Sequence, residues 1–247
     1  MSALPPGSEV FADAEAASVA AAERFVAACA GGAERIAVCL SGGSTPRRFY
    51  GLLATAAFRD RVPWARLHVF FGDERVVPPD SPDSNLRLAR ETLLDHVPVP
   101  RSQVHPIPTD GAAETGAADY EALLKRWYGS DTLDPARPLF DLMLLGTGPD
   151  GHTASLFPGK PEIETRDRWA VAVPQPGLPP HVPRVSLTFP ALDASRTVLF
   201  LATGANKRDP VARIGAGEPL PAARARGRET VWLLDRAAAG EAPCTES

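Results

Sequence analysis

Residues 139–159 read LFDLMLLGTGPDGHTASLFPG, and this stretch decides the fold that we expect for the chain. It begins with an apolar run, 142–145, whose length and composition are typical of a strand buried on both faces of a parallel sheet. Glycine and proline follow at 146–149, where they allow a sharp turn. Asp150 and His152 come next. Because ligands bind where strands of an open α/β sheet end, this Asp-x-His pair is a predicted chemical site.

The alternative for this pair alone is a helix-capping aspartate beside a solvated histidine. Other loops of the same kind decide between the two interpretations. Three further predicted strands, 36–40, 67–71 and 197–202, also run into polar residues at their ends. Since the carboxyl ends of parallel strands share one edge of a sheet, we expect these junctions to lie together. The three junctions are Ser41–Thr45, Asp73–Arg75 and Gly204–Lys207.

Residues 41–45, here called the glycine loop, lie between a predicted strand and a helix predicted over 47–57. Free backbone N–H groups at a helix start bind anions, and paired glycines let a ligand approach closely. The candidate phosphate ligands are Gly42, Gly43, Ser44 and Thr45. The alternative is that the hydroxyl groups only cap the helix. The loop matches neither a dinucleotide-binding nor a Walker pattern, so nucleotides are not favoured.

The composition limits the class of protein. A length of 247 residues fits a single α/β domain over 1–247, and 44% hydrophobic with 23% charged residues is ordinary for a globular chain. The net charge of −4 offers no basic surface to nucleic acid or to acidic lipid. No membrane-spanning run or signal peptide is predicted, so we expect a cytoplasmic protein, monomeric or a small homo-oligomer.

The cysteines Cys29, Cys39 and Cys244 are scattered without metal-ligand spacing, so we expect reduced thiols and no metal site. His68 and His105 lie beside apolar residues and are predicted to be structural, as is His96. The remaining predicted strands are 104–107, 169–173, 184–189 and 229–235, and the remaining predicted helices are 12–30, 84–94, 112–128, 191–195 and 207–215.

The predicted junctions together suit acid–base chemistry on a small phosphorylated metabolite, without a cofactor. A glycine loop, Arg75 and Lys207 can hold a phosphate dianion by charge-assisted hydrogen bonds. His152 is the candidate general base, because histidine ordinarily titrates near neutrality. Asp150 is expected to orient its imidazole or to stabilise its cation.

Four segments of the chain, LSGGSTP, GDERVVP, GTGPDGHTASLFP and LFLATGANK, resemble in order and spacing those of the bacterial 6-phosphogluconolactonases. The resemblance runs from about residue 10 to the closing WLLDRAA. It implies a Rossmann-like, mostly parallel sheet with helices on both faces, of the sugar-phosphate isomerase/lactonase type. The reaction that it implies is hydrolysis of 6-phospho-D-glucono-1,5-lactone to 6-phosphogluconate, the second step of the pentose phosphate pathway.

The related glucosamine-6-phosphate deaminases differ at two places. They have Asp-Glu-Tyr where this chain has Asp73, Glu74 and Arg75, and a catalytic glutamate where it has Phe157. Loss of that carboxylate and gain of a cation favour lactonase. A deaminase or isomerase, and a non-catalytic phosphosugar-binding module, stay open as alternatives.

The resemblance also bears on other charged residues. Arg184 is a further candidate for the phosphate, and Asp73 would either hold Arg75 or face the site. The developing oxyanion would be met by N–H groups near Gly42 and Gly43 or by a cation. The family commonly has Asn-Ala where this chain has Asp193-Ala194, and we expect Asp193 to cap the short helix 191–195.

Overall fold

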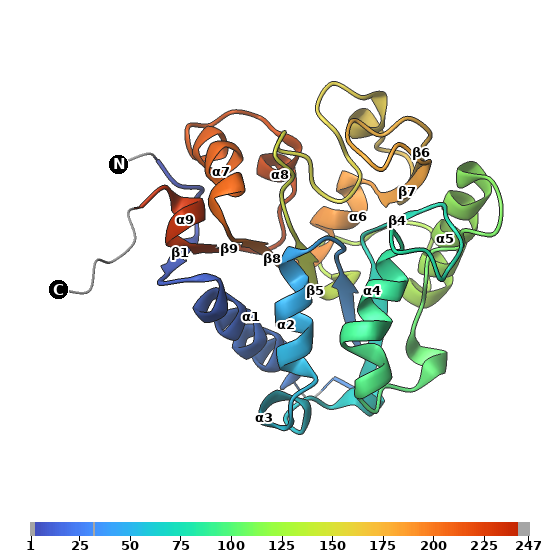
Figure 1. Ribbon diagram of the computed structural model, residues 1–247. Coiled ribbons are helices and arrows are strands. Elements are labelled where there is room, and N and C mark those ends of the chain that lie inside the picture. Colours follow the sequence, from blue (N-terminus) through green and yellow to red (C-terminus); the bar gives the residue numbers. More distant parts are fainter. Residues whose placement is uncertain (1–2, 32, 242–247) are drawn as a thin grey trace.

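The computed structural model describes residues 3–31 and 33–241. At its centre lies a six-stranded sheet of order β1-β9-β8-β5-β2-β3, flanked by helices (Figure 1). Every strand pair in it is parallel, as predicted. In chain order the strands are β1 (Ser8–Phe11), β2 (Ile36–Leu40), β3 (Leu67–Phe71), β5 (Phe140–Leu145), β8 (Ser195–Ala202) and β9 (Glu229–Asp235).

The helices connect these strands and cover them. α1 contacts β5, β8 and β9, and α2 packs on α1 beside it. None of the helices in the described part of the chain is long and apolar enough to cross a lipid bilayer. The helices are α1 (Ala14–Cys29), α2 (Thr45–Leu53), α3 (Ala56–Arg59), α4 (Asn85–Thr92), α5 (Ala113–Tyr128), α6 (Phe189–Asp193), α7 (Arg208–Gly215), α8 (Pro221–Arg224) and α9 (Arg236–Ala239).

The middle strands form the core of the molecule. All four residues of the apolar run 142–145 are buried, which confirms the prediction of a strand covered on both faces. Aromatic rings fill the space beside the sheet, with Phe200 and Trp232 stacked at a centroid distance of 3.9 Å. Burial on this scale fixes the strands, so the loops that leave them start from rigid positions.

A second, antiparallel sheet has the order β4-β7-β6 and was not predicted. It consists of β4 (Asp73–Arg75), β6 (Ala170–Val173) and β7 (Arg184–Leu187). Gly72 joins the two sheets, because its N–H donates to Leu40 O at 3.0 Å and its carbonyl accepts from Leu187 N at 2.8 Å. The charged residues after β3 therefore form a strand of their own instead of a loop.

Two other predictions were wrong in detail, and one strand was missed. The predicted strand 104–107 is a single bridge between Val69 and Val104, because Pro106 has no N–H group to continue a ladder. The predicted helix 47–57 ends at Leu53, and Thr55 in an extended conformation separates it from α3. β1 was not predicted, and the predicted helix 12–30 begins just after it.

Asp193 does not cap the short helix near it. The helix α6 ends at Asp193, so the residue stands at its carboxyl end. Its Oδ1 accepts a hydrogen bond from Arg226 N at 2.9 Å, and burial raises the pKa of this carboxyl despite the positive charges nearby. The capping prediction was wrong because the helix begins earlier, at Phe189 and Pro190, where proline suits a first turn.

The cysteines of the described chain are free and buried. Burial raises the pKa of Cys29 to about 12, so its thiol stays protonated near neutral pH. Cys39 is fully buried in β2, and burial raises the pKa of its thiol well above the ordinary value. Cys244 lies outside the described residues.

His68 and His105 form a pair at the edge strand β3. Their rings are stacked, and His68 Nδ1 lies 3.0 Å from His105 Nε2. Trp127 packs against both rings, and the guanidinium group of Arg35 lies over the Trp127 ring. Burial, then His105 and Arg35, lowers the pKa of His68 to about 4, while burial and Arg35 lower the pKa of His105. Both histidines are structural in this sense.

This pair predicts a loss of stability in acid. The pKa of His68 is about 4 when folded, whereas an unfolded histidine titrates at about 6.5. As the pH falls below about 6.5 the unfolded chain binds the proton first, so stability falls progressively toward about pH 4. Thermal melts across this range should show that His68→Asn loses less stability than the unmodified protein does. His181→Asn, at an exposed position, is the control. Equal acid sensitivity in all three proteins would contradict the prediction.

Candidate functional site

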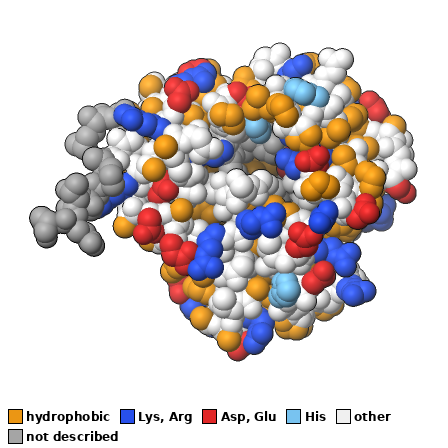
Figure 2. All heavy atoms as spheres, in the orientation of Figure 1, with side chains coloured by type: hydrophobic (Ala, Val, Ile, Leu, Met, Phe, Trp, Pro, Cys, Tyr) orange, Lys and Arg blue, Asp and Glu red, His pale blue; other side chains and the backbone are white. Residues whose placement is uncertain are grey.

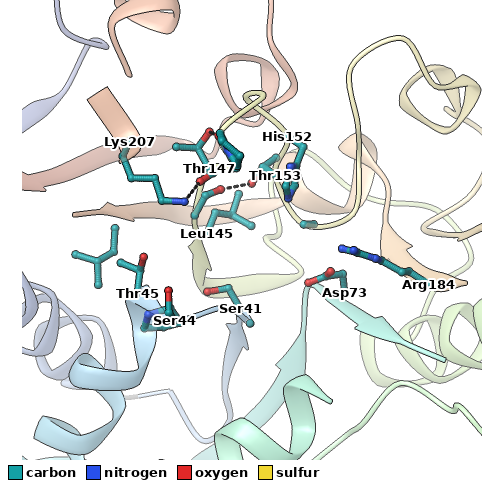
Figure 3. A pocket seen from close by; sticks show the side chains of 18 of the residues that line it. Ser41, Ser44, Thr45, Asp73, Leu145, Thr147, His152, Thr153, Arg184 and Lys207 are labelled. Carbon is teal, nitrogen blue, oxygen red and sulfur yellow. Dashed lines mark hydrogen bonds between the residues drawn. The ribbon is translucent and has the colours of Figure 1, made fainter. Parts of the chain in front are cut away.

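The carboxyl ends of β2, β5 and β8 open onto a cavity of about 210 Å³. Figure 2 shows this face hollowed, with basic side chains and a histidine around it. The cavity brings together residues that are far apart in the sequence (Figure 3). The predicted site residues that line it are Gly42, Gly43, Ser44, Thr45, Asp73, Arg75, His152, Arg184 and Lys207.

Asp150 does not line the cavity but holds His152. Its Oδ1 lies 2.6 Å from His152 Nδ1 and also accepts from His152 N at 3.2 Å. Burial acts to raise the pKa of Asp150, but the hydrogen bond and the charge of His152 outweigh it and hold this pKa below the ordinary value. With Nδ1 as the donor to Asp150, the lone pair of the imidazole is on Nε2. No helix begins at Thr153, so the capping alternative was wrong.

A tight turn presents this pair. Gly148 N donates to His152 O at 2.8 Å, and Gly151 N donates to Gly148 O at 3.0 Å. Gly151 has φ +84°, a conformation that glycine adopts without strain. Gly148 and Gly151 therefore let the chain turn back sharply. This turn directs His152 to the cavity, with Asp150 held against it.

Phe157 lies behind the imidazole. The centroid of the Phe157 ring lies 4.4 Å from the ring centroid of His152. The same Phe157 centroid lies 5.2 Å from the guanidinium carbon of Arg184. Phe157 is 1% exposed. The position where a related deaminase would have a carboxylate is thus an apolar ring between the imidazole of His152 and the guanidinium of Arg184.

The three residues of β4 have separate tasks. Asp73 is buried, and its carboxylate accepts from Ser155 Oγ at 2.6 Å and from Asn85 Nδ2 at 3.2 Å. Of the two expectations for Asp73, it therefore faces the site and does not pair with Arg75. Arg75 Nη1 donates to Asp83 O at 2.6 Å, and its buried Nε has no hydrogen-bond partner in the part of the chain that is described.

Glu74 caps α4. Its carboxylate accepts from Asn85 N and Leu86 N, both at 2.8 Å, and from Ser84 Oγ at 3.1 Å. Burial raises the pKa of Glu74, although these N–H groups act against the shift. A carboxylate at a helix start is stabilised by the helix dipole. Glu74, Ser155 and Asn85 support the site but were not among the predicted residues, although Ser84-Asn85 was expected to open the helix.

Arg184 fastens the proline-rich loop between β6 and β7. Its side chain is almost fully buried, and Nη2 donates to Leu178 O at 2.9 Å and Pro180 O at 3.2 Å. Its Nε has no partner among the described residues. Burial lowers the pKa of this guanidinium, partly offset by Asp73. Arg184 is thus both a wall of the cavity and the anchor of the loop.

Lys207 and the glycine loop lie on the other side of the cavity (Figure 3). Lys207 Nζ donates to Thr147 O at 2.7 Å, and burial lowers its pKa while Asp150 acts to raise it. Ser44 stands at the start of α2 but makes no capping hydrogen bond with its side chain. The structure therefore does not support the alternative in which the hydroxyl groups of the glycine loop only cap the helix.

Comparisons with known proteins show which family the chain resembles. The profile of a family described as glucosamine-6-phosphate isomerases/6-phosphogluconolactonase matches residues 12–232. A 6-phosphogluconolactonase of Mycobacterium tuberculosis is 40% identical over 248 residues, covering 95% of this chain and 98% of its own. One from Nostoc sp. is 40% identical over 215 residues, covering 84% of this chain and 85% of its own.

Solved structures show the same likeness. The crystal structure of 6-phosphogluconolactonase from Thermotoga maritima has a TM-score of 0.79 and 35% identity, covering 92% of this chain and 98% of its own. A monomeric glucosamine-6-phosphate deaminase has a TM-score of 0.80 at 19% identity, covering 94% of this chain and 98% of its own. The likeness to the deaminase extends to the fold alone.

The turn predicts a sensitive position at Gly148. A Cβ atom there would lie 2.0 Å from His152 Nδ1 and 2.8 Å from Asp150 Oδ1, so Gly148→Ala must push the two side chains apart. We expect activity to fall by roughly 10²-fold while the fold persists, since the loss is one of orientation. Gly51→Ala in α2, where a Cβ meets nothing within 4 Å, is the control. Steady-state kinetics and thermal melts decide; near-native turnover in Gly148→Ala would contradict the prediction.

Proposed function

The chain belongs to the family of glucosamine-6-phosphate isomerases and 6-phosphogluconolactonases, and we propose that it works there as a lactonase with His152 as its general base. Its reaction is hydrolysis of 6-phospho-D-glucono-1,5-lactone to 6-phospho-D-gluconate, in the oxidative branch of the pentose phosphate pathway. Its named relatives at about 40% identity are 6-phosphogluconolactonases. We expect it to act in the cytoplasm.

The observation that carries the catalytic proposal is the contact of 2.6 Å between Asp150 Oδ1 and His152 Nδ1. An imidazole held at Nδ1 by a carboxylate has its basic nitrogen, Nε2, free for a water molecule. No hydrogen bond of Nε2 occurs in the described chain. Because His152 lines the cavity and Asp150 stands behind it, the pair is oriented for use on a molecule bound there.

In the proposed mechanism, His152 Nε2 takes a proton from water as the water oxygen bonds to C1 of the lactone. The carbonyl oxygen becomes an oxyanion, which the cations around the cavity stabilise. The imidazolium then donates the proton to the ring oxygen as the C1–O bond breaks. The acid product leaves, and His152 is again neutral. Asp150 stabilises the imidazolium in between, with its low pKa keeping it ionised.

We assign the 6-phosphate group to Lys207 and the glycine loop, with Arg75 and Arg184 adding positive charge. All three cations donate to backbone carbonyl oxygens, which direct the side chains without neutralising them. The buried Nε atoms of both arginines have no partner in the described structure, so an anion in the cavity would give them an acceptor.

Phe157 favours this reaction over deamination. Ring opening and amine chemistry in the related deaminases use a carboxylate at this position, whereas here an apolar ring packs on the imidazole at 4.4 Å. Water activation at an ester carbonyl needs only the base and its aspartate. If the protein were a deaminase, it would release ammonia from glucosamine 6-phosphate, and an ammonia assay tests this alternative directly.

Turnover of the lactone should depend on His152. Purified protein should accelerate opening of the lactone above its spontaneous rate and release no ammonia from glucosamine 6-phosphate. His152→Ala should lower kcat by ~10²–10⁴-fold with KM largely kept, because a general base acts in the chemical step. His181→Ala, on the exposed proline-rich loop, is the matched control. Near-native kcat in His152→Ala would remove His152 from the proposed role, and no acceleration by the unmodified protein would remove the lactonase.

Affinity for the lactone should depend on Lys207. Lys207→Ala should raise KM by roughly tenfold or more while kcat falls less, because a charged hydrogen bond to phosphate is lost in both ground and transition states. Lys160→Ala, outside the cavity, should change neither constant. Initial rates over a range of lactone concentrations measure both. An unchanged saturation curve for Lys207→Ala would take this lysine out of the phosphate site.

A further inference from the structure

A buried tyrosine outside the cavity holds the first residue of the glycine loop. Tyr50 lies in α2 and is fully buried. Its hydroxyl oxygen accepts from Ser41 N at 3.1 Å, and its O–H group donates to Ser41 O at 2.6 Å. One phenol group therefore satisfies both backbone polar groups of a single residue. Burial keeps this phenol protonated, since it raises the pKa of Tyr50 well above the ordinary value.

Ser41 needs this support because the sheet has ended there. The ladder of β2 reaches Leu40, and beyond it β2 and its neighbours part to open the cavity. The next residues have no such support. In the described structure, the N–H groups of Gly42 and Gly43 donate no hydrogen bond. Packing against the Asn85 amide restricts the position of the Gly42 backbone, since a Cβ atom on Gly42 would overlap that amide.

The neighbouring strand offers a matched comparison. Tyr120 in α5 is also fully buried, and its hydroxyl group accepts from Phe71 N and donates to Phe71 O, both at 2.9 Å. Phe71 ends β3 and does not line the cavity. The residue after it, Gly72, is fixed independently by hydrogen bonds to both sheets. Loss of the Tyr120 hydroxyl should therefore cost stability without moving the site.

We propose that Tyr50 is a positioning residue for substrate binding: it fixes Ser41 so that the free N–H groups of the glycine loop stay directed at the phosphate group of the substrate. The proposal rests on the function proposed above, in which this loop binds phosphate. Tyr50 touches no substrate itself. It acts through the backbone of Ser41, and Tyr120 makes the same pair of hydrogen bonds to Phe71, a residue that does not line the cavity.

The test compares Tyr50→Phe with Tyr120→Phe, each of which removes one buried hydroxyl group and keeps the ring. Thermal melts should show that both lose stability to a similar degree. Tyr50→Phe should raise KM for the lactone and weaken binding of the product, 6-phosphogluconate, by roughly tenfold, since hydrogen bonds to a charged group are misplaced. Its kcat should stay within about threefold, because the loop binds the ground and transition states alike. Tyr120→Phe should leave KM and product binding unchanged.

Two results would overturn the proposal. One is an unchanged KM in Tyr50→Phe, and the other is an equal rise of KM in both variants, which would mean a general loosening of the fold. These failures are distinct from failure of the proposed function. Lactone opening that still depends on His152, together with unchanged KM in Tyr50→Phe, would refute the positioning role alone.

Amide hydrogen exchange on the unmodified protein tests the same proposal if Tyr50→Phe does not fold. The Ser41 amide should exchange slowly without ligand, because it is hydrogen-bonded to the buried Tyr50 hydroxyl. The amides of Gly42 and Gly43 should exchange rapidly and become protected when 6-phosphogluconate is added. Rapid exchange at Ser41, or no protection of the loop by 6-phosphogluconate, would overturn the proposal.

Discussion

The rest of the structure depends on the constraint that buried backbone groups need hydrogen bonds where parallel strands part. The residues after each strand end meet it differently. Tyr50 supplies both partners for Ser41, and Gly72 bonds to a strand of each sheet. The amides of Gly42 and Gly43 have no partner within the described chain. At the cavity, therefore, the backbone N–H groups after a strand end stay accessible to solvent or to a ligand.

The same cavity keeps its positive charge. Arg75, Arg184 and Lys207 are all oriented by backbone carbonyl oxygens, and none of them forms an ion pair in the described structure. A carbonyl oxygen fixes the direction of a cation but cancels little of its charge. A carboxylate would have done both, and Asp73 is instead occupied by Ser155 and Asn85. The arrangement suits a phosphorylated substrate because binding need not first break an ion pair.

The sequence predicted the parallel sheet and most of the side chains that the structure brings to the cavity, because both follow largely from short-range patterns: apolar runs, glycine turns and the Asp-x-His pair. Seven of the eight predicted strands are strands of the structure, including 142–145 and 36–40, and only 104–107 is not. The antiparallel sheet was missed because β4 has three residues, too few to show a period. The supports of the site, such as Tyr50 and Glu74, were missed because a buried polar group is defined by its contacts. No residue pattern near them in the sequence shows those contacts.

The division of the site between two sheets has a mechanical consequence. The glycine loop, His152 and Lys207 belong to loops of the large sheet, while Arg75 and Arg184 lie in β4 and β7 of the small one. Hydrogen bonds at Gly72, from Ser155 Oγ to Asp73 and from Ser155 N to Ser186 Oγ are among the contacts that join these two units. Under the proposed assignment, a substrate held from both sides would form a temporary crosslink between the sheets. Occupancy should therefore resist separation of the small sheet and couple its local opening to the concentration of ligand.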